Sequence, residues 1–262
     1  MRRILSLTAA YLRVGVANEL QYRANFFIQI LQSLIALGTG LIGLALVFGQ
    51  TGALAGWTRP ELLAVMGVYI IMGGLIMSLI QPNMMRLMEE VQQGTLDYAL
   101  TKPADSQVLI SVREFRFWQL VDVVVGIVVL VIALLQMEGR MGWMQALSFI
   151  VALLLGAAMI YCFWLMLTAS AFWIVRIDEI ANLFQGIYAA GRWPVGIYPG
   201  WLRYGLTFIV PVAFAVTVPA EALTGRLTWQ TLLGAAALAL GLLLVSRWVW
   251  KKGVRNYSGA SA

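Results

Sequence analysis

The chain has 262 residues, of which 61% are hydrophobic and only 11% charged. Soluble domains are about 45–50% apolar, glycine included, and about 25% charged. A water-soluble fold of this size could not bury so much apolar surface. The composition therefore excludes a soluble enzyme domain, a disordered chain and a disulfide-stapled module, and it indicates an integral membrane protein.

The 18 Lys and Arg against 12 Asp and Glu give a formal net charge of +6. In a soluble protein this excess would suggest nucleic acid as a partner. Here the basic residues lie mainly at the ends of apolar runs, as expected where loops face the cytoplasm, so we expect membrane lipids as partners and no nucleic acid. The chain has no His and a single cysteine, Cys162, inside an apolar run. We expect no catalytic, cofactor-binding or metal-binding residues.

The amino-terminal segment over 2–23 shows apolar residues at helical spacing between basic ones, including Arg13 and Arg23. This pattern is typical of an amphipathic helix lying on the cytoplasmic face of the membrane. A leader that only orients the first span would show the same pattern, and both interpretations stay open.

Long charge-poor runs follow this segment, and each is long enough, or nearly so, to cross a bilayer as a helix. Strict alternation is absent, which excludes the strands of a membrane barrel. The sequence therefore predicts an all-α membrane protein of about six transmembrane helices in a single transmembrane domain over 1–262. The runs are 24–58, 62–85, 117–137, 141–175, 204–220 and 227–246, with a weaker one at 180–198.

The basic residues also predict the orientation of the spans. Most of them fall on one side, whereas Arg59, Arg140 and Arg226 fall on the other. The richer side is expected to be cytoplasmic, so both termini are cytoplasmic and the number of spans is even. One of 180–198 and 204–220 then cannot span fully.

Four prolines, Pro194, Pro199, Pro211 and Pro219, break the region that these two candidates occupy. We expect a fifth span over about 179–198, followed by short re-entrant helices within an outer region over 199–225, because irregular backbone at membrane depth is tolerated where protein surrounds it. The reverse assignment stays open.

The connection between the second and third spans, residues 84–116, is the most informative segment outside the membrane. A helix is expected to continue from the second span and to stop at Gly94 in a left-handed conformation. Residues 95–100 can form one short helical turn ending before Pro103, and Ser106 can cap a further helix that leads into the third span. Leu96, Tyr98 and Leu100 could be apolar anchors for a partner, or they could simply pack within the loop.

Few ionisable residues lie within the spans or the proline-rich region. Asp122 stands near the cytoplasmic end of the third span, where we expect it to pair with a neighbouring Arg or to reach the interface; a role in a translocation path is the alternative. Arg192 and Arg203 flank the proline-rich region and are expected to anchor it at the interface, or to meet an anionic headgroup or substrate. No phosphate-binding loop of the G-x-x-x-x-G-K-[ST] type occurs, so we expect no ATPase site of that kind in this chain.

Several motifs together resemble those of ABC-2 type permeases, in particular the bacterial viologen- or daunorubicin-type exporters. They are E-E-V-Q-Q-G-T-L-D-Y-A-L-T-K-P at 89–103, F-W-I-V-R at 172–176, R-W-P-V-G-I-Y-P at 192–199 and N-Y-S-G-A-S-A at 256–262.

The resemblance implies a non-enzymatic export permease in the bacterial plasma membrane. It would form half of a translocation pathway with a second permease, identical or homologous, and would be driven by two cytoplasmic subunits that bind ATP with Mg. It also implies that Glu89, Glu90, Asp97 and Tyr98 lie at or near the contact with those subunits. The alternatives are a lipid-modifying membrane enzyme and a structural or assembly protein, neither of which needs an ATPase partner.

Overall fold

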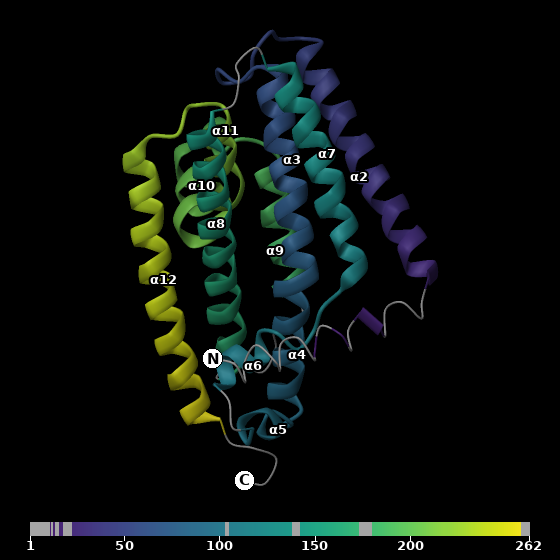
Figure 1. The fold of residues 1–262 in the computed structure, drawn as a ribbon. Helices are drawn as coiled ribbons and strands as arrows, with labels where there is room; N and C mark the ends of the chain where they lie inside the picture. Colours follow the sequence, from purple (N-terminus) through teal and green to yellow (C-terminus); the bar gives the residue numbers. More distant parts are fainter. Residues whose placement is uncertain are drawn as a thin grey trace.

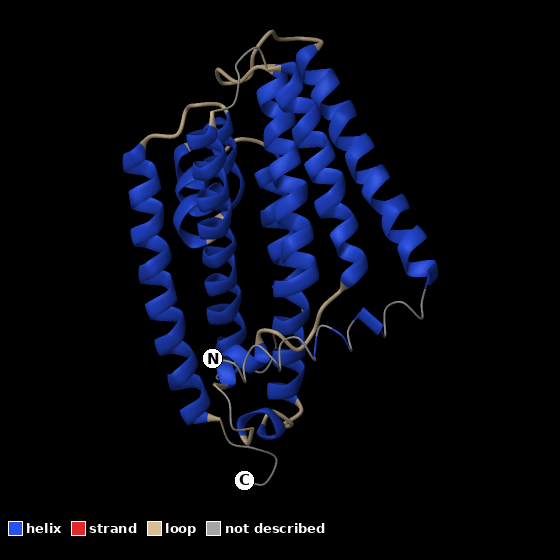
Figure 2. Cartoon of the chain, viewed as in Figure 1, coloured by secondary structure: helices blue, strands red, loops and turns tan. Residues whose placement is uncertain are grey.

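The computed structural model describes residues 11, 13, 16–17, 23–102, 105–137, 142–172 and 180–257. The regular elements in these ranges are helices, apart from one isolated bridge between Leu54 and Trp57 (Figure 2). The predicted all-α membrane fold is confirmed. The amphipathic helix expected over 2–23 falls mostly outside the described ranges and stays a prediction.

Five continuous helical stretches are long and apolar enough to cross a membrane (Figure 1). They match the runs expected at 24–58, 62–85, 117–137, 141–175 and 227–246. Their helices are α2 (Arg23–Phe48), α3 (Arg59–Leu75) continued by the π-helical turn η1 (Ile76–Ile80) and α4 (Gln81–Gln92), α7 (Leu120–Gln136) preceded by the short 3-10 helix η2 (Phe117–Gln119), α8 (Trp143–Ala169) and α12 (Trp229–Asn256).

The region between α8 and α12 contains no further continuous span in its described part. Its first helix, α9 (Ile180–Ala189), has only 10 residues, so the full helix expected over 179–198 is not formed. A bent pair of short helical stretches follows, Gly200–Ile209 and Ala213–Leu223, with an angle of 77° between them. The first stretch contains α10 (Gly200–Tyr204), and the second ends in α11 (Val218–Leu223). The count is therefore five spans, or six if the bent pair is one span.

The second arm of the bent pair runs along half of α8. A Cβ built on Gly156, midway along α8, would lie 2.4 Å from the carbonyl oxygen of Phe214, so the backbones touch there. A Cβ built on Gly225, just after the arm, would lie 3.2 Å from Gln145 in the first turn of α8. The arm therefore extends from the middle of the bundle to the end where α8 begins, as the expected short re-entrant helices would.

Two central helices, α3 and α7, are joined through glycines. A Cβ built on Gly126 of α7 would lie 2.7 Å from the backbone nitrogen of Ile71 and 2.8 Å from the carbonyl oxygen of Gly67. A Cβ on Gly74 would meet the backbone nitrogen of Val123 at 2.9 Å. Small residues let helix backbones approach closely in lipid, where burial of apolar surface no longer drives association. The α3–α7 seam is accordingly the tight centre of the bundle.

Replacing Gly126 with Ala should loosen this seam. The added methyl group has no space beside Ile71, so the helices must separate, at a cost of about 1–3 kcal/mol. We expect a lower thermal unfolding midpoint of the purified protein in detergent. Gly241→Ala in α12 is the matched control, because no atom lies within 4 Å of its added Cβ. Equal midpoints for the two variants would contradict the seam.

Candidate functional site

The 84–116 connection lies at the end of the bundle where α4 and α12 end (Figure 1). This end carries Arg86, Arg113 and Arg247, so we call it the basic end. As expected, α4 ends at Gln92, Gly94 adopts a positive φ of 71°, and a short helix, α5 (Asp97–Leu100), follows. The next helix, α6 (Ser106–Ile110), begins differently from the prediction.

Asp105, rather than Ser106, caps α6. The Asp105 side chain accepts hydrogen bonds from the backbone N–H groups of Gln107 and Val108, at 3.0 and 3.3 Å. The helix also does not lead directly into α7, because it ends at Ile110 and a non-helical stretch precedes η2. The connection is thus a folded-back segment.

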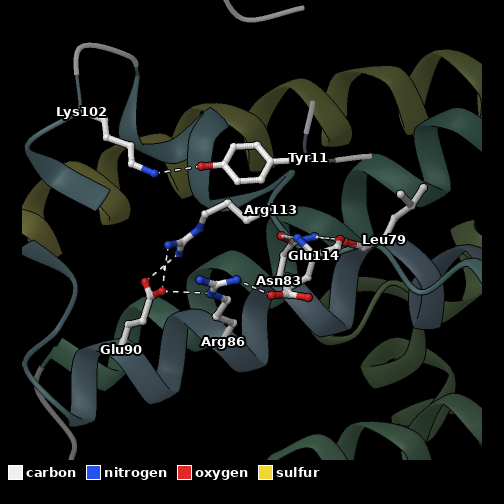
Figure 3. A network of polar contacts seen from close by, with 8 residues as sticks. All are labelled: Tyr11, Leu79, Asn83, Arg86, Glu90, Lys102, Arg113 and Glu114. Carbon is white, nitrogen blue, oxygen red and sulfur yellow. Dashed lines mark hydrogen bonds and ion pairs between the residues drawn. The ribbon is translucent and has the colours of Figure 1, made fainter. Parts of the chain in front are cut away.

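Its core is a network of ion pairs between α4 and the returning chain (Figure 3). Arg113 donates two hydrogen bonds to Glu90, at 2.8 and 2.7 Å, and the two side chains are only 6% and 15% exposed. Arg86 donates to Glu90 at 3.0 Å and also pairs with Glu114. Because both members of the Glu90–Arg113 pair are largely withdrawn from water, each needs the other.

An amide side chain adds a second tie between the same two segments. The buried Asn83 donates to the carbonyl oxygens of Leu79 and Glu114, at 2.7 and 2.8 Å, and accepts from the Glu114 N–H at 2.8 Å (Figure 3). The two bonds to Glu114 imitate strand pairing and hold the non-helical chain against α4. The return path of the connection is thereby fixed.

Arg247 and Trp250 of α12, and Tyr257 directly after it, contact the connection on the side away from α4. We call these three residues the α12 clamp. Arg247 pairs with Asp105, and the Trp250 indole donates to Ser106 at 3.3 Å. The Leu96 N–H donates to the hydroxyl of Tyr257 at 3.2 Å. The clamp therefore contacts both short helices, α5 and α6.

The hydrogen bonds from Arg247 hold the pKa of Asp105 below its usual value. A carboxyl group whose pKa is lowered on folding contributes stability above its unfolded pKa of about 3.9 and loses it as the pH falls through the folded value. The pair between Asp105 and Arg247 is therefore fully formed at neutral pH and is lost only in acid.

The six predicted contact residues separate into two groups. Glu89, Asp97 and Tyr98 are exposed, with Tyr98 at 78%. Leu96 is 0% exposed, and Leu100 is half-buried against the core. Leu96 and Leu100, together with Glu90 in the ion pairs, therefore stabilise the connection itself. Only Glu89, Asp97 and Tyr98 of the six are exposed, so the accessible surface is smaller than the sequence suggested.

The comparison with known families identifies the protein class. A profile of ABC-2 family transporter proteins matches residues 34–261. The chain belongs to this family. Neither the curated proteins nor the solved structures give a significant match. The chain is therefore a membrane transport protein, and the narrower viologen- or daunorubicin-type assignment stays a prediction.

The ionisable residues of this ABC-2 transporter lie elsewhere in the bundle. Asp122 accepts hydrogen bonds from the Ser33 hydroxyl and, at 3.0 Å, from the Gln29 amide. We expected a neighbouring Arg or the interface as the surroundings of Asp122; the partners found among the described residues are neutral donors of α2, which its sequence did not single out. Arg192 lies over the ring of Tyr69 at 5.7 Å, whereas Arg203 is exposed on α10.

Asp122 and Arg192 both line a cavity of about 280 Å³ between α2, α3, α7 and α9. Its walls include an aromatic stack in which Tyr188 lies 4.8 Å from Tyr69 and 5.8 Å from Phe184, between ring centroids. The sequence analysis missed this stack, because the rings come from helices far apart in the chain. In the described part of the transporter, no group of three or more metal-ligating side chains is found.

Replacing Arg113 with Gln should destabilise the connection strongly. Glu90 would lose its bidentate partner while remaining largely buried, and breaking a buried pair costs about 3–5 kcal/mol. We expect faster proteolysis within the connection and a lower unfolding midpoint in detergent. The exposed Arg255 on α12 is the matched control, and Arg255→Gln should change neither the proteolysis nor the unfolding midpoint.

The double variant Glu90→Leu with Arg113→Met should recover much of the loss, because a packed apolar pair can replace a buried ion pair. Equal proteolysis of Arg113→Gln and the unchanged protein would contradict the structural role of the pair.

Proposed function

We propose that the chain is the transmembrane subunit of an ATP-driven exporter and that it couples, through α5, to separate ATP-binding subunits. The observation that supports this most directly is the exposure of Tyr98 and Asp97 on a short helix that is rigidly held on its inner side. Aromatic side chains that are exposed in the free protein and become buried at the centre of an interface provide much of its binding energy. Because α5 is short, is held on its inner side and presents Tyr98, it is suited both to bind an ATPase subunit and to transmit force from it.

The arrangement of charge is consistent with this role. Under the positive-inside rule the basic end is cytoplasmic, which places α5 where soluble ATPases can reach it. ATP and Mg would be held entirely by those partners. We further propose that the protein resides in a bacterial plasma membrane with both termini in the cytoplasm.

The cavity between α2, α3 and α9 supports a translocation pathway on this chain. It combines a carboxylate, a guanidinium and aromatic faces within the membrane-spanning bundle, a combination that suits amphipathic cargo. The cavity is partly open, and we propose that a second permease, identical or homologous, forms the other half of the pathway.

Replacing Tyr98 with Ala should weaken association with the ATPase subunits about tenfold or more, as expected for an aromatic hot spot. Asp97→Asn should weaken it less. The measurement is co-purification and titration of the ATPase subunit against the detergent-solubilised permease. Tyr204→Ala, which removes another exposed Tyr, on α10, is the matched control and should bind normally.

Normal ATPase binding and normal ATP-driven transport in Tyr98→Ala would refute coupling through α5. A permease that purifies without any ATPase and turns over a lipid would instead support the membrane-enzyme alternative.

The α12 clamp should matter for coupling more than for binding. Tyr257→Phe removes the acceptor of the Leu96 N–H and keeps the ring, which packs against Phe172. We expect ATPase association to persist while the number of substrate molecules moved per ATP falls. Lys251→Gln, exposed on the same helix, should leave this ratio unchanged. An unchanged ratio in Tyr257→Phe would show that the clamp has no part in transmission.

A further inference from the structure

The seam between α2 and α7 opens as a groove on the outside of the bundle. Figure 1 shows the two helices diverging toward the basic end. A hollow of about 420 Å³ lies between them, and every side chain that lines it is apolar. Leu34 and Val124, on its two walls, are exposed, so the groove is open to the hydrocarbon of the membrane.

A second, polar hollow of about 260 Å³ adjoins the groove at its basic end. Arg116, Asn25, Gln29 and Gln119 line it. Trp118 lines both hollows, and its ring lies 5.1 Å from that of Phe26, which belongs to the groove. The apolar and polar hollows thus adjoin at Trp118, an aromatic residue of the kind that prefers the headgroup layer of a membrane.

Among the described residues that line this site of two adjoining hollows, Arg116 alone is positively charged. Its side chain is exposed and forms no ion pair with any residue in the described ranges, whereas Arg86, Arg113 and Arg247 are all paired. Its backbone N–H is bonded to the carbonyl oxygen of Ser78 at 3.1 Å, so this backbone position is fixed, while the guanidinium has no ion-pair partner in the part of the chain that the structure describes. The one acidic residue within α2 and α7, Asp122, already accepts hydrogen bonds from Ser33 and Gln29.

We propose that this site binds one anionic phospholipid from the leaflet at the basic end. An acyl chain would occupy the groove, and the phosphate would lie against Arg116 with the side-chain amides beside it. Basic pockets between membrane helices recognise anionic headgroups in this way, and a guanidinium binds phosphate through paired donors. The inference is independent of the proposed ATPase coupling.

The lipid would steady the least-packed helix of the bundle. Most of α2 faces outward, with Phe27, Leu31 and Ile35 exposed, while its opposite face lines the cavity at Ser33 and Gly40. A lipid held between α2 and α7 would therefore set the position of one cavity wall.

The test uses the full chain in nanodiscs that contain a photoactivatable phosphatidylglycerol or, separately, a photoactivatable phosphatidylcholine. We expect the anionic lipid to label residues 26–34 and 117–125 more strongly than the zwitterionic one. Arg116→Gln should lower the anionic labelling about fivefold, the equivalent of ~1 kcal/mol for one basic residue near the surface. Arg116→Lys should retain most of it, and Lys251→Gln should match the unchanged protein.

A groove-filling variant, Val124→Trp, tests the acyl-chain part while leaving Arg116 in place and should also reduce labelling. Equal labelling by the two lipids, or unchanged labelling in both Arg116→Gln and Val124→Trp, would overturn the proposal. Full competition by soluble glycerol phosphate would overturn it as well, since the groove would then contribute nothing. Should Arg116→Gln fail to fold, Val124→Trp and the comparison of lipids decide.

Discussion

The buried ion pair between Glu90 and Arg113 is the interaction on which the basic end depends. Neither side chain has enough water around it to be stable as an isolated charge, so the returning chain must bring Arg113 to α4 whenever the protein is folded. That requirement determines where the connection turns. It also leaves α5 projecting from the bundle with Tyr98 outward, because the inner face is already filled by Leu96.

The rest of the bundle supports this pair through contacts of different physical kinds. Asn83 holds the return path by bonding to the backbone, and the α12 clamp holds α5 and α6 from the far side. The π-helical turn η1 lies between α3 and α4, so the ion pairs and the glycine seam belong to one continuous helical span. The chain at α5 is therefore tied to α4, and through it to α3, by the Thr95 N–H bond to the Glu90 carbonyl oxygen, and to α12 by Tyr257.

How much the sequence could predict depended on the range of the interaction. Hydropathy located the five long spans, and Gly94 marked the end of α4, because both are local properties of the chain. Arg113, the buried partner of Glu90, lies 23 residues away, and the partners of Asp122 lie 89 and 93 residues away, so no local pattern indicates them. Asp105 replaced Ser106 as the cap for a related reason, since its pairing with Arg247 of α12 also fixes its position. The short α9 follows from the proline-rich chain after it, which hydropathy alone could not resolve.

The different packing of the helices indicates which part of the transporter can move. The α3–α7 seam is closed by backbone contacts at Gly67 and Gly126, and separating it would break many contacts at once. By contrast, α2 is held to α7 by hydrogen bonds to Asp122 and by a few ring contacts. Since α2 also forms a wall of the cavity, a shift of α2 would change the width of that cavity without breaking the backbone contacts of the seam or the ion pairs of the connection. The lipid that we propose beside Arg116 would therefore contact α2. The ATPase contact that we propose at α5 would instead act on the connection and on the closely packed α3 and α7.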